Sequence, residues 1–403
     1  MVLVALAVGA SGLTCLGGTG GSGYPKTAAW VRRTINTGAH AGPSVVAVAD
    51  FDGDSMLDVA VGYPGAAPVV AAVFIFFQDT TESFTAVELA SSADLEGVAA
   101  LAIADLNNDG SLDIVAACNG RLVFLNSPAA PRTEAWTQST IAESSGTGLG
   151  QWTDVAIGAI DAANGPDIVA CNSEAPGRVS WFASPSASIA NGAGWTRTDV
   201  DMAMRSGASS VALADFNADG RQDVVSTATG ESADRIAWYA NPTDPVNDAW
   251  TKHAIGNLTS ATRMVVADIN ADGRSDVVGL NGPGRQIGWY QRPTDATTAW
   301  TGYLLTMYTT ATPVDVKAAD VDGDGQIDIV VATNSGGTLR WFVPFPGMTQ
   351  TAQWLENNLI DVAETIGRIA LGDIDGDGRP DVIAPLLGAT TAADSVVWLE
   401  NPE

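Results

Sequence analysis

The chain has 403 residues, of which 46% are hydrophobic, and 46 acidic against 19 basic side chains give it a formal net charge of −27. The apolar content excludes global disorder. The chain is longer than an ordinary domain with a single core, which favours a fold built of repeats. The negative charge argues against nucleic acids and anionic membranes as partners. The three cysteines do not indicate a disulfide framework. The only two histidines in the sequence, His40 and His253, do not indicate a zinc site or a histidine-based catalytic site.

Residues 1–27 form an N-terminal tail ahead of the repeated part of the chain. Residues 2–16 carry no charge, yet the run is too short and too rich in glycine to span a membrane. Two interpretations of the tail stay open. One is the apolar part of a secretory signal peptide, although no Lys or Arg precedes it. The other is the remnant of an upstream repeat, because the segment resembles residues 113–128.

Seven segments then repeat one pattern of apolar strand, Asp-containing loop and second apolar strand. The first Asp of each segment follows the previous one by 52 to 56 residues, at Asp50, Asp105, Asp161, Asp215, Asp268, Asp320 and Asp373. A third strand such as 235–242 and a Trp-headed fourth strand such as 249–255 complete each repeat. Four short strands in about 50 residues are typical of a propeller blade. We therefore predict an all-β fold, a seven-bladed β-propeller with four-stranded blades, over residues 28–403.

The phase of the repeat also predicts how the ring closes. The strand before each Asp loop consists mainly of Val and Ala, which suit the crowded propeller axis, so the Trp-headed strand is the outermost strand. The last repeat lacks this strand, while residues 29–35 form an unassigned copy of it at the other end of the chain. We predict that strand 29–35 pairs beside 395–399, which brings Trp30 near Trp398 and removes an exposed edge.

Six of the seven loops fit the pattern D-x-[DN]-x-D-[GS]-x-x-D, which favours calcium. Calcium takes six to eight oxygen ligands in flexible geometry, and the side chains at positions one, three, five and nine with a backbone carbonyl at position seven supply them. Glycine at position six allows the left-handed backbone of the wrap. Valine-rich strands flank the loops, which excludes an EF-hand. The predicted ligands, with position seven named in fourth place, are Asp50, Asp52, Asp54, Met56 and Asp58; Asp105, Asn107, Asp109, Ser111 and Asp113; Asp215, Asn217, Asp219, Arg221 and Asp223; Asp268, Asn270, Asp272, Arg274 and Asp276; Asp320, Asp322, Asp324, Gln326 and Asp328; and Asp373, Asp375, Asp377, Arg379 and Asp381.

Two loops depart from the pattern. The first has Ser55 where the others have glycine, so its geometry is less regular. The loop from Asp161 to Asp167, counted from Asp161, is two residues short and lacks carboxylates at positions three and five. We predict that it binds no calcium, and that the whole chain binds about six calcium ions.

The loops and the recurring WY-x-N-P segment resemble the FG-GAP/VCBS repeats of integrin α-subunit-like seven-bladed propellers, over residues 29–403. The resemblance implies that the calcium loops join the first and second strands of each blade on the lower face. It also implies an extracellular, secreted or cell-surface location and a role in adhesion, glycan binding, protein binding or scaffolding. Some related propellers are polysaccharide lyases.

The leading hypothesis is a non-enzymatic, calcium-stabilised extracellular module whose partner is a glycan or a protein. Whether it forms part of a larger chain or assembly stays open. The alternative is a carbohydrate-active enzyme, such as a calcium-assisted polysaccharide lyase or a hydrolase. A hydrolase needs a close carboxylate pair outside the calcium loops, and the sequence indicates no such pair and no catalytic residue. His40 and His253 are interpreted as structural or surface residues.

The resemblance places the ligand face opposite the calcium loops. Candidate ligand-binding residues there are Tyr63, Trp152, Arg205, Glu231 and Tyr308. Trp152 and Tyr308 lie outside the repeated tryptophan positions, and we predict that both are more exposed than those tryptophans. Stacking on a sugar ring is one interpretation, and packing within a loop is the other.

Overall fold

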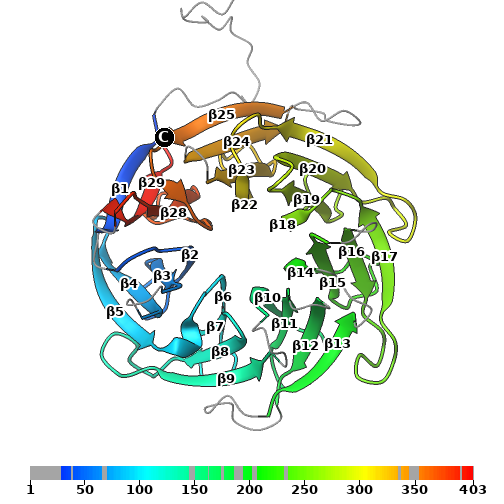
Figure 1. The fold of residues 1–403 in the computed structure, drawn as a ribbon, viewed down its shortest axis with the longest axis horizontal. Helices are drawn as coiled ribbons and strands as arrows, with labels where there is room; N and C mark the ends of the chain where they lie inside the picture. The colour runs from blue at the N-terminus through cyan, green and yellow to red at the C-terminus, as the bar shows by residue number, and fades with distance from the viewer. Residues whose placement is uncertain are drawn as a thin grey trace, which may run out of the picture.

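The structure, a computed structural model, describes residues 29–37, 40–65, 70–144, 150–161, 163–173, 177–185, 194–201, 207–230, 235–334, 337–344, 354–390 and 393–402. Seven antiparallel sheets are arranged around a central axis (Figure 1). We number these sheets as blades 1 to 7 in chain order. The propeller prediction is confirmed, whereas both interpretations of residues 1–27 fall outside the described residues.

Each of the first six blades has four consecutive strands, ordered from the axis outward. Blade 1 has β2 (Val45–Ala49), β3 (Asp58–Tyr63), β4 (Ala72–Thr80) and β5 (Ser83–Ser91), followed by the short 3₁₀ helix η1 (Ala93–Leu95). Blade 2 has β6 (Ala100–Ala104), β7 (Asp113–Ala117), β8 (Arg121–Asn126) and β9 (Thr137–Glu143). Blade 3 has β10 (Trp152–Gly158), β11 (Asp167–Asn172), β12 (Arg178–Ala183) and β13 (Thr196–Asp201).

The second half of the ring continues this order. Blade 4 has β14 (Ala208–Ala214), β15 (Asp223–Ala228), β16 (Ile236–Ala240) and β17 (Thr251–Gly256). Blade 5 has β18 (Ala261–Ala267), β19 (Asp276–Asn281), β20 (Gln286–Gln291) and β21 (Thr301–Met307). Blade 6 has β22 (Pro313–Ala319), β23 (Asp328–Thr333), β24 (Thr338–Pro344) and β25 (Trp354–Asp361). Blade 7 has β26 (Thr365–Ile366), β27 (Ala370–Gly372), β28 (Asp381–Leu387), β29 (Ser395–Glu400) and the N-terminal strand β1 (Val31–Thr37).

The core lies between neighbouring blades. Every residue of the second strand in blade 4, β15, is buried because another blade covers each face of the sheet. Bulky rings in the third strands fill the widening space between blades: Trp238 is 1% exposed and packs with Phe216 of its own blade and Trp300 of blade 5. The repeated tryptophans of the third strands therefore serve in blade packing.

The N-terminal strand closes the ring as predicted. Strand β1 pairs antiparallel with β29, and Arg33 lies directly opposite Trp398. The Arg33 guanidinium lies 6.0 Å from the centre of the Trp398 ring, and its Nε donates to Glu400 at 2.8 Å. The residue opposite Trp398 is thus Arg33 and not the predicted Trp30, whose ring meets Trp341 of blade 6 edge-on at 6.4 Å. The last blade is therefore completed by a strand from the other end of the chain, which covers the edge of β29.

The inner strand of blade 7 is interrupted at Gly367 and Arg368. Opposite this gap, Pro385 in β28 accepts a hydrogen bond from Gly367 at 3.0 Å but has no N–H to return. Arg368 instead donates its backbone N–H to Ser44 of blade 1 at 2.8 Å. The break therefore turns the Arg368 backbone toward the next blade. In the part of the chain that the structure describes, no helix has the length and apolar character to cross a membrane.

Candidate metal sites

The Asp loops connect the first and second strands of each blade at one end of the ring. We number loop positions from the residue that follows the inner strand. In blade 6, Asp320 at position one accepts the backbone N–H groups of Asp324 at 3.0 Å and Gly325 at 2.9 Å, and Asp324 accepts that of Gln326 at 2.8 Å. These nested turns wrap the loop around its own carboxylates.

Left-handed backbone occurs at positions four and six of the loops. Position six has φ of +86° at Gly325, and Ser55 of blade 1 adopts +72° there. Ser55 still donates to Asp50 at 2.9 Å, so the serine keeps the loop geometry despite the steric cost for a residue with a Cβ. Position four is also left-handed, including Ala218 and Ala271 at φ of +59° and +57°. Sequence reasoning missed this second position.

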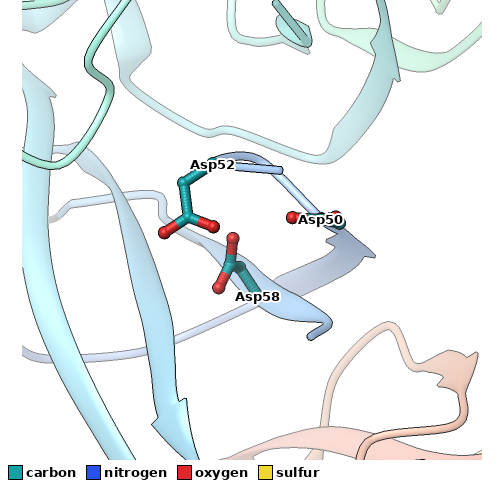
Figure 2. Close-up of side chains that lie close together, drawn as sticks. All are labelled: Asp50, Asp52 and Asp58. Atoms are coloured by element: carbon teal, nitrogen blue, oxygen red, sulfur yellow. The ribbon is translucent and has the colours of Figure 1, made fainter. Parts of the chain in front are cut away.

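Three loops bring carboxylates together. In blades 1, 6 and 7, oxygen atoms from positions one, three and nine lie within 4.8 Å of one another: Asp50, Asp52 and Asp58; Asp320, Asp322 and Asp328; and Asp373, Asp375 and Asp381. Figure 2 shows the blade 1 group, in which the three side chains face a common space. Three converging carboxylates suit a hard, oxygen-seeking divalent cation, so the residues present fit calcium.

The other three sequence-predicted loops have asparagine at position three. In each, the Asn oxygen accepts the N–H of position five, for example Asp219 to Asn217 at 2.9 Å. Their folded geometry matches that of the all-Asp loops, with one formal charge fewer. The backbone carbonyls predicted as ligands at position seven stay a prediction. The side chains of Arg221, Arg274 and Arg379 at that position reach instead to the Asp at position five of their own loops.

The Asp at position nine has a structural role that the sequence motif did not indicate. In blade 4, the carboxylate of Asp223 accepts N–H groups from Phe216 at 2.9 Å and from Asn241, just past the third strand, at 2.8 Å. It thus links the Asp loop to the end of the third strand of the same blade. Burial, only partly offset by these hydrogen bonds, raises the pKa of Asp223 to about 6 and that of Asp381 in blade 7 to about 7.

In blade 6 the Asp at position nine lacks the hydrogen bond from the end of the third strand. The residue three places after the blade 6 tryptophan Trp341 is Pro344, which has no N–H to donate. Asp328 therefore receives a single backbone N–H, that of Val321 at 3.0 Å, with the Trp341 indole nearby, and its Oδ1 is buried without a hydrogen-bond partner among the described residues. Burial and the nearby Asp322 carboxylate raise the pKa of Asp328 to about 8. An unpartnered buried carboxylate oxygen facing two further carboxylates is the environment that a cation relieves.

The loop in blade 3 corrects the sequence-based register. Strand β10 ends at Gly158, and Asp167 accepts the N–H of Ile160 at 3.0 Å, as Asp223 does from Phe216. Position one is therefore Ala159, and Asp161 occupies position three. The loop has full length, and the prediction that it is two residues short is wrong. It lacks carboxylates at positions one and five, so the expectation of no calcium there stays a prediction.

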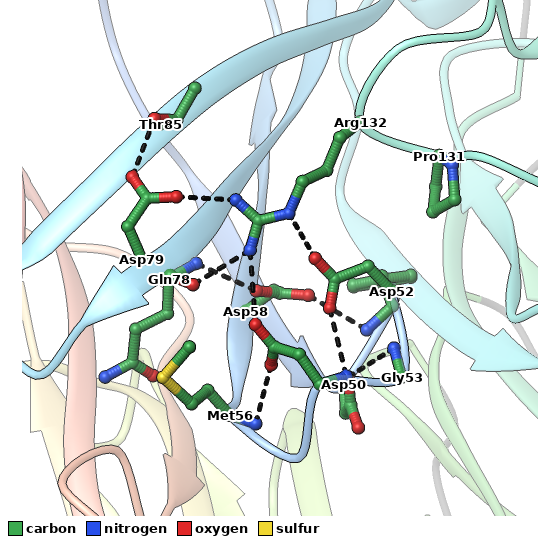
Figure 3. Close-up of polar contacts among 12 residues, drawn as sticks. Asp50, Asp52, Gly53, Met56, Asp58, Gln78, Asp79, Thr85, Pro131 and Arg132 are labelled. Atoms are coloured by element: carbon green, nitrogen blue, oxygen red, sulfur yellow. Dashed lines mark hydrogen bonds and ion pairs between the residues drawn. The ribbon is translucent and has the colours of Figure 1, made fainter.

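The first loop carries a second feature that sequence reasoning missed. Arg132, in the connection between β8 and β9 of blade 2, donates its Nε hydrogen to Asp52 of blade 1 (Figure 3). The same guanidinium contacts Asp54 at 3.4 Å and Asp79 at 2.6 Å and lies 4.8 Å from the centre of the Phe77 ring. A cation from the neighbouring blade thus neutralises part of this loop.

The predicted ligand-face residues do not form one site. Trp152 is 1% exposed and packs edge-on against Phe182 at 5.8 Å, so the prediction that it is more exposed than the repeated tryptophans is wrong. In the corrected register Trp152 begins the inner strand at the place held by Ala208 and Ala261, which are also buried. Tyr63 is 1% exposed within β3.

The other candidates differ in their surroundings. Tyr308 is half-buried beside a cavity of about 280 Å³ that Arg340 and Glu356 also line, and burial raises its hydroxyl pKa. Arg205 and Glu231 lie outside the described residues. His253 stacks on Trp238 at 4.3 Å, and His40 lies 4.1 Å from Phe74, in agreement with structural or surface roles.

Comparisons with known proteins agree with this architecture. The model of the FG-GAP-like repeat family matches residues 50–116, 215–279, 268–331 and 320–384. None of the curated proteins compared with this chain matches it in sequence. The family match omits blade 3, whose loop lacks the position-one Asp.

Solved structures with the same fold are distant in sequence. A lectin of Agrocybe aegerita, described as specifically recognising non-reducing terminal N-acetylglucosamine, has a TM-score of 0.51 and 14% identity over 79% of this chain and 80% of its own. BBS1N in complex with ARL6DN, in crystals soaked with lead or mercury, has TM-scores of 0.55 and 0.57 at 10% and 11% identity. Both alignments cover 93% of this chain and 97% of that chain. At these identities the similarity concerns the fold alone.

Proposed function

Because this chain belongs to the FG-GAP-like repeat family, we propose that it is a non-enzymatic, calcium-stabilised binding or structural module that works in the extracellular space. The observation that carries the proposal is the convergence of three carboxylates within 4.8 Å in each of blades 1, 6 and 7. Without a cation these groups repel one another in a partly buried setting. Bound calcium would supply the opposing charge and accept their oxygens as ligands.

The location follows from the strength of such sites. Loops of this kind in extracellular modules have dissociation constants of about 10⁻⁴ to 10⁻³ M. External calcium fills sites of this strength, whereas cytosolic calcium leaves them empty. A fold that depends on them therefore suits a secreted or cell-surface protein.

The direct test is the number of calcium ions bound per chain. Equilibrium dialysis against millimolar calcium, with metal counting by mass spectrometry, is expected to give about six ions. Replacement of Asp373→Asn is expected to remove about one, because Asp373 holds the first position of the blade 7 loop. Asp161→Asn in blade 3 is the matched control and is expected to leave the count unchanged. A count near zero would contradict the proposal.

The propeller supplies a rigid scaffold, and the partner we propose is a glycan or an extracellular protein. Support for a glycan comes from the fold shared with the Agrocybe aegerita lectin, a similarity that concerns architecture. Glycan-array binding with calcium and with EDTA tests this part. Release of cleaved products from acidic polysaccharides would instead favour the lyase alternative and contradict a non-enzymatic role.

A further inference from the structure

A cavity of about 580 Å³ opens at the axis, at the end of the ring away from the Asp loops. Residues at the starts of the inner strands line it, including Thr153 of blade 3, Ser209 of blade 4, Arg263 of blade 5 and Arg368 of blade 7. A volume of this size suits a small-molecule ligand. Among the described residues that line the cavity, none is Asp or Glu.

The two arginines occupy equivalent places in their blades, five residues before position one of the Asp loop. Counting five residues back in every blade gives a ring of axial residues: Val45, Ala100, Asp154, Ser210, Arg263, Asp315 and Arg368. Arg368 lies 3.0 Å from Asp154, although blades 1 and 2 separate their blades on one side and blades 4 to 6 on the other. This ion pair therefore reaches across the axis, and its arginine, Arg368, lines the cavity.

Arg263 is incompletely partnered. Its Nη1 donates to the backbone oxygen of Ser209 in the neighbouring blade and, at 2.9 Å, to that of Thr262. Among the residues that the structure describes, none accepts a hydrogen bond from its buried Nε. Burial, together with the nearby Arg368 cation, lowers the pKa of Arg263 to about 10. Two guanidinium groups therefore face one cavity at close range.

The carboxylates around the axis are already engaged. Asp154 accepts hydrogen bonds from Ser210 at 2.7 Å and Val211 at 3.1 Å in addition to its pair with Arg368. Asp315 accepts the N–H of Ile369 at 2.9 Å and lies 3.4 Å from Lys317. Asp154 and Asp315 offset part of the lowering of the Arg263 pKa, but neither carboxylate is among the residues that line the cavity, whereas Arg263 and Arg368 both are.

We propose that the axial cavity binds the oxyanion of a small acidic ligand, with the size of an acidic monosaccharide such as a uronate. Arg263 supplies the guanidinium donors, Arg368 supplies a second positive charge, and the small polar residues Thr153 and Ser209 line the wall. Guanidinium groups bind carboxylate and sulfate through charge-assisted hydrogen bonds, which are stronger in a cavity than on an open surface. The site lies at the opposite end of the ring from the Asp loops and goes beyond the proposed calcium role.

The test is isothermal titration of the calcium-loaded protein with glucuronate, glucose and sulfate at constant ionic strength. Glucuronate is expected to bind saturably and one to one, and glucose, which lacks the charge, is expected not to bind. Sulfate is expected to compete with glucuronate, because both present an oxyanion. Arg263→Gln is expected to weaken glucuronate binding about tenfold through loss of a charge-assisted contact. Arg235→Gln, outside the cavity, is the matched control.

A second measurement tests the proposal on the wild-type protein, so that it does not depend on whether the Arg263→Gln variant folds. In the wild-type protein, glucuronate is expected to slow phenylglyoxal labelling of Arg263 and Arg368 but not of Arg235, as read by peptide mass spectrometry. Absence of saturable binding would overturn the proposal, as would equal binding by a folded Arg263→Gln variant. Calcium is present throughout and its count per chain is measured separately, so failure here is distinguishable from failure of the calcium proposal.

Discussion

Arg132 of blade 2 donates its Nε hydrogen to the carboxylate of Asp52 in the Asp loop of blade 1 (Figure 3). The loop that has Ser55 in place of glycine thus also has a tethered cation. This contact links two blades at the end of the ring where we propose calcium binds, whereas the arginines that contact the loops of blades 4, 5 and 7 belong to those loops themselves.

The first prediction concerns this contact. Arg132→Gln should lower the melting temperature more in EDTA than in saturating calcium, because a bound ion replaces the lost charge. Removing a charged hydrogen-bonding partner costs about 1 to 3 kcal/mol in the calcium-free protein. Paired melting curves of the variant and wild type measure the difference. Arg178→Gln, whose partner Asp199 lies outside the loops, is the control. An equal loss in both buffers would contradict the interpretation of Arg132 as a counter-ion.

The second prediction separates the two roles of position nine. Asp328→Asn in blade 6 should remove about one bound calcium per chain, because Asp328 combines an unpartnered oxygen with two neighbouring carboxylates. Asp167→Asn in blade 3 should leave the calcium count unchanged and still destabilise the protein by about 1 to 3 kcal/mol, through its hydrogen bonds to Ile160 and Ser184. Metal counting and urea unfolding measure the two effects. Loss of calcium from both variants would contradict the division of roles.

The third prediction is a pH dependence that calcium changes. In the folded, calcium-free protein the pKa values of Asp58, Asp113, Asp276 and Asp381 are raised to about 7, chiefly by burial. An unfolded Asp has a pKa of about 3.9, so the folded state binds more protons between these values. Stability in EDTA should therefore fall as pH rises from about 4 to about 7.

Saturating calcium should flatten or reverse this slope, because the ion binds the deprotonated carboxylates. Melting curves across this pH range in EDTA and in calcium measure both slopes. Stability that rises with pH in EDTA would show that these carboxylates are not held protonated by burial.

The fourth prediction concerns ring closure. A chain beginning at residue 38 lacks β1 and exposes the edge of β29, so it should associate or aggregate. A chain beginning at residue 29 keeps β1 and should behave like the 403-residue chain. Size-exclusion chromatography with light scattering distinguishes them. A monomeric, equally stable chain without β1 would show that the strand is dispensable for closing the ring.

Periodicity explains what could be predicted from the sequence. The spacing of Asp loops predicted seven blades, and the missing strand after Trp398 predicted closure by the N-terminal strand. Equivalence between repeats, however, depends on the correct register. Counting blade 3 from Asp161 rather than Ala159 produced both the apparent deletion in that loop and the placement of Trp152 in an exposed loop.

Contacts between non-equivalent residues could not be predicted in this way. Asp154 and Arg368 are 214 residues apart and meet only because the ring closes around the axis. Arg132 reaches Asp52 from the next blade through a turn that the repeat pattern treats as variable. A repeat identifies which residues are equivalent, but the side chains that meet across the axis or between blades depend on the assembled ring.

The most direct test of the central claim is thermal melting in excess EDTA and in millimolar calcium, with metal counting on the same samples. At about ten times its dissociation constant, one site adds about 1.4 kcal/mol, so six sites add roughly 8 kcal/mol. For a chain of this length that corresponds to a rise in melting temperature of about 10 °C. We predict such a rise together with about six calcium ions per chain. An unchanged melting temperature with a metal count near zero would show that the loops are Asp-Gly turns that need no cation.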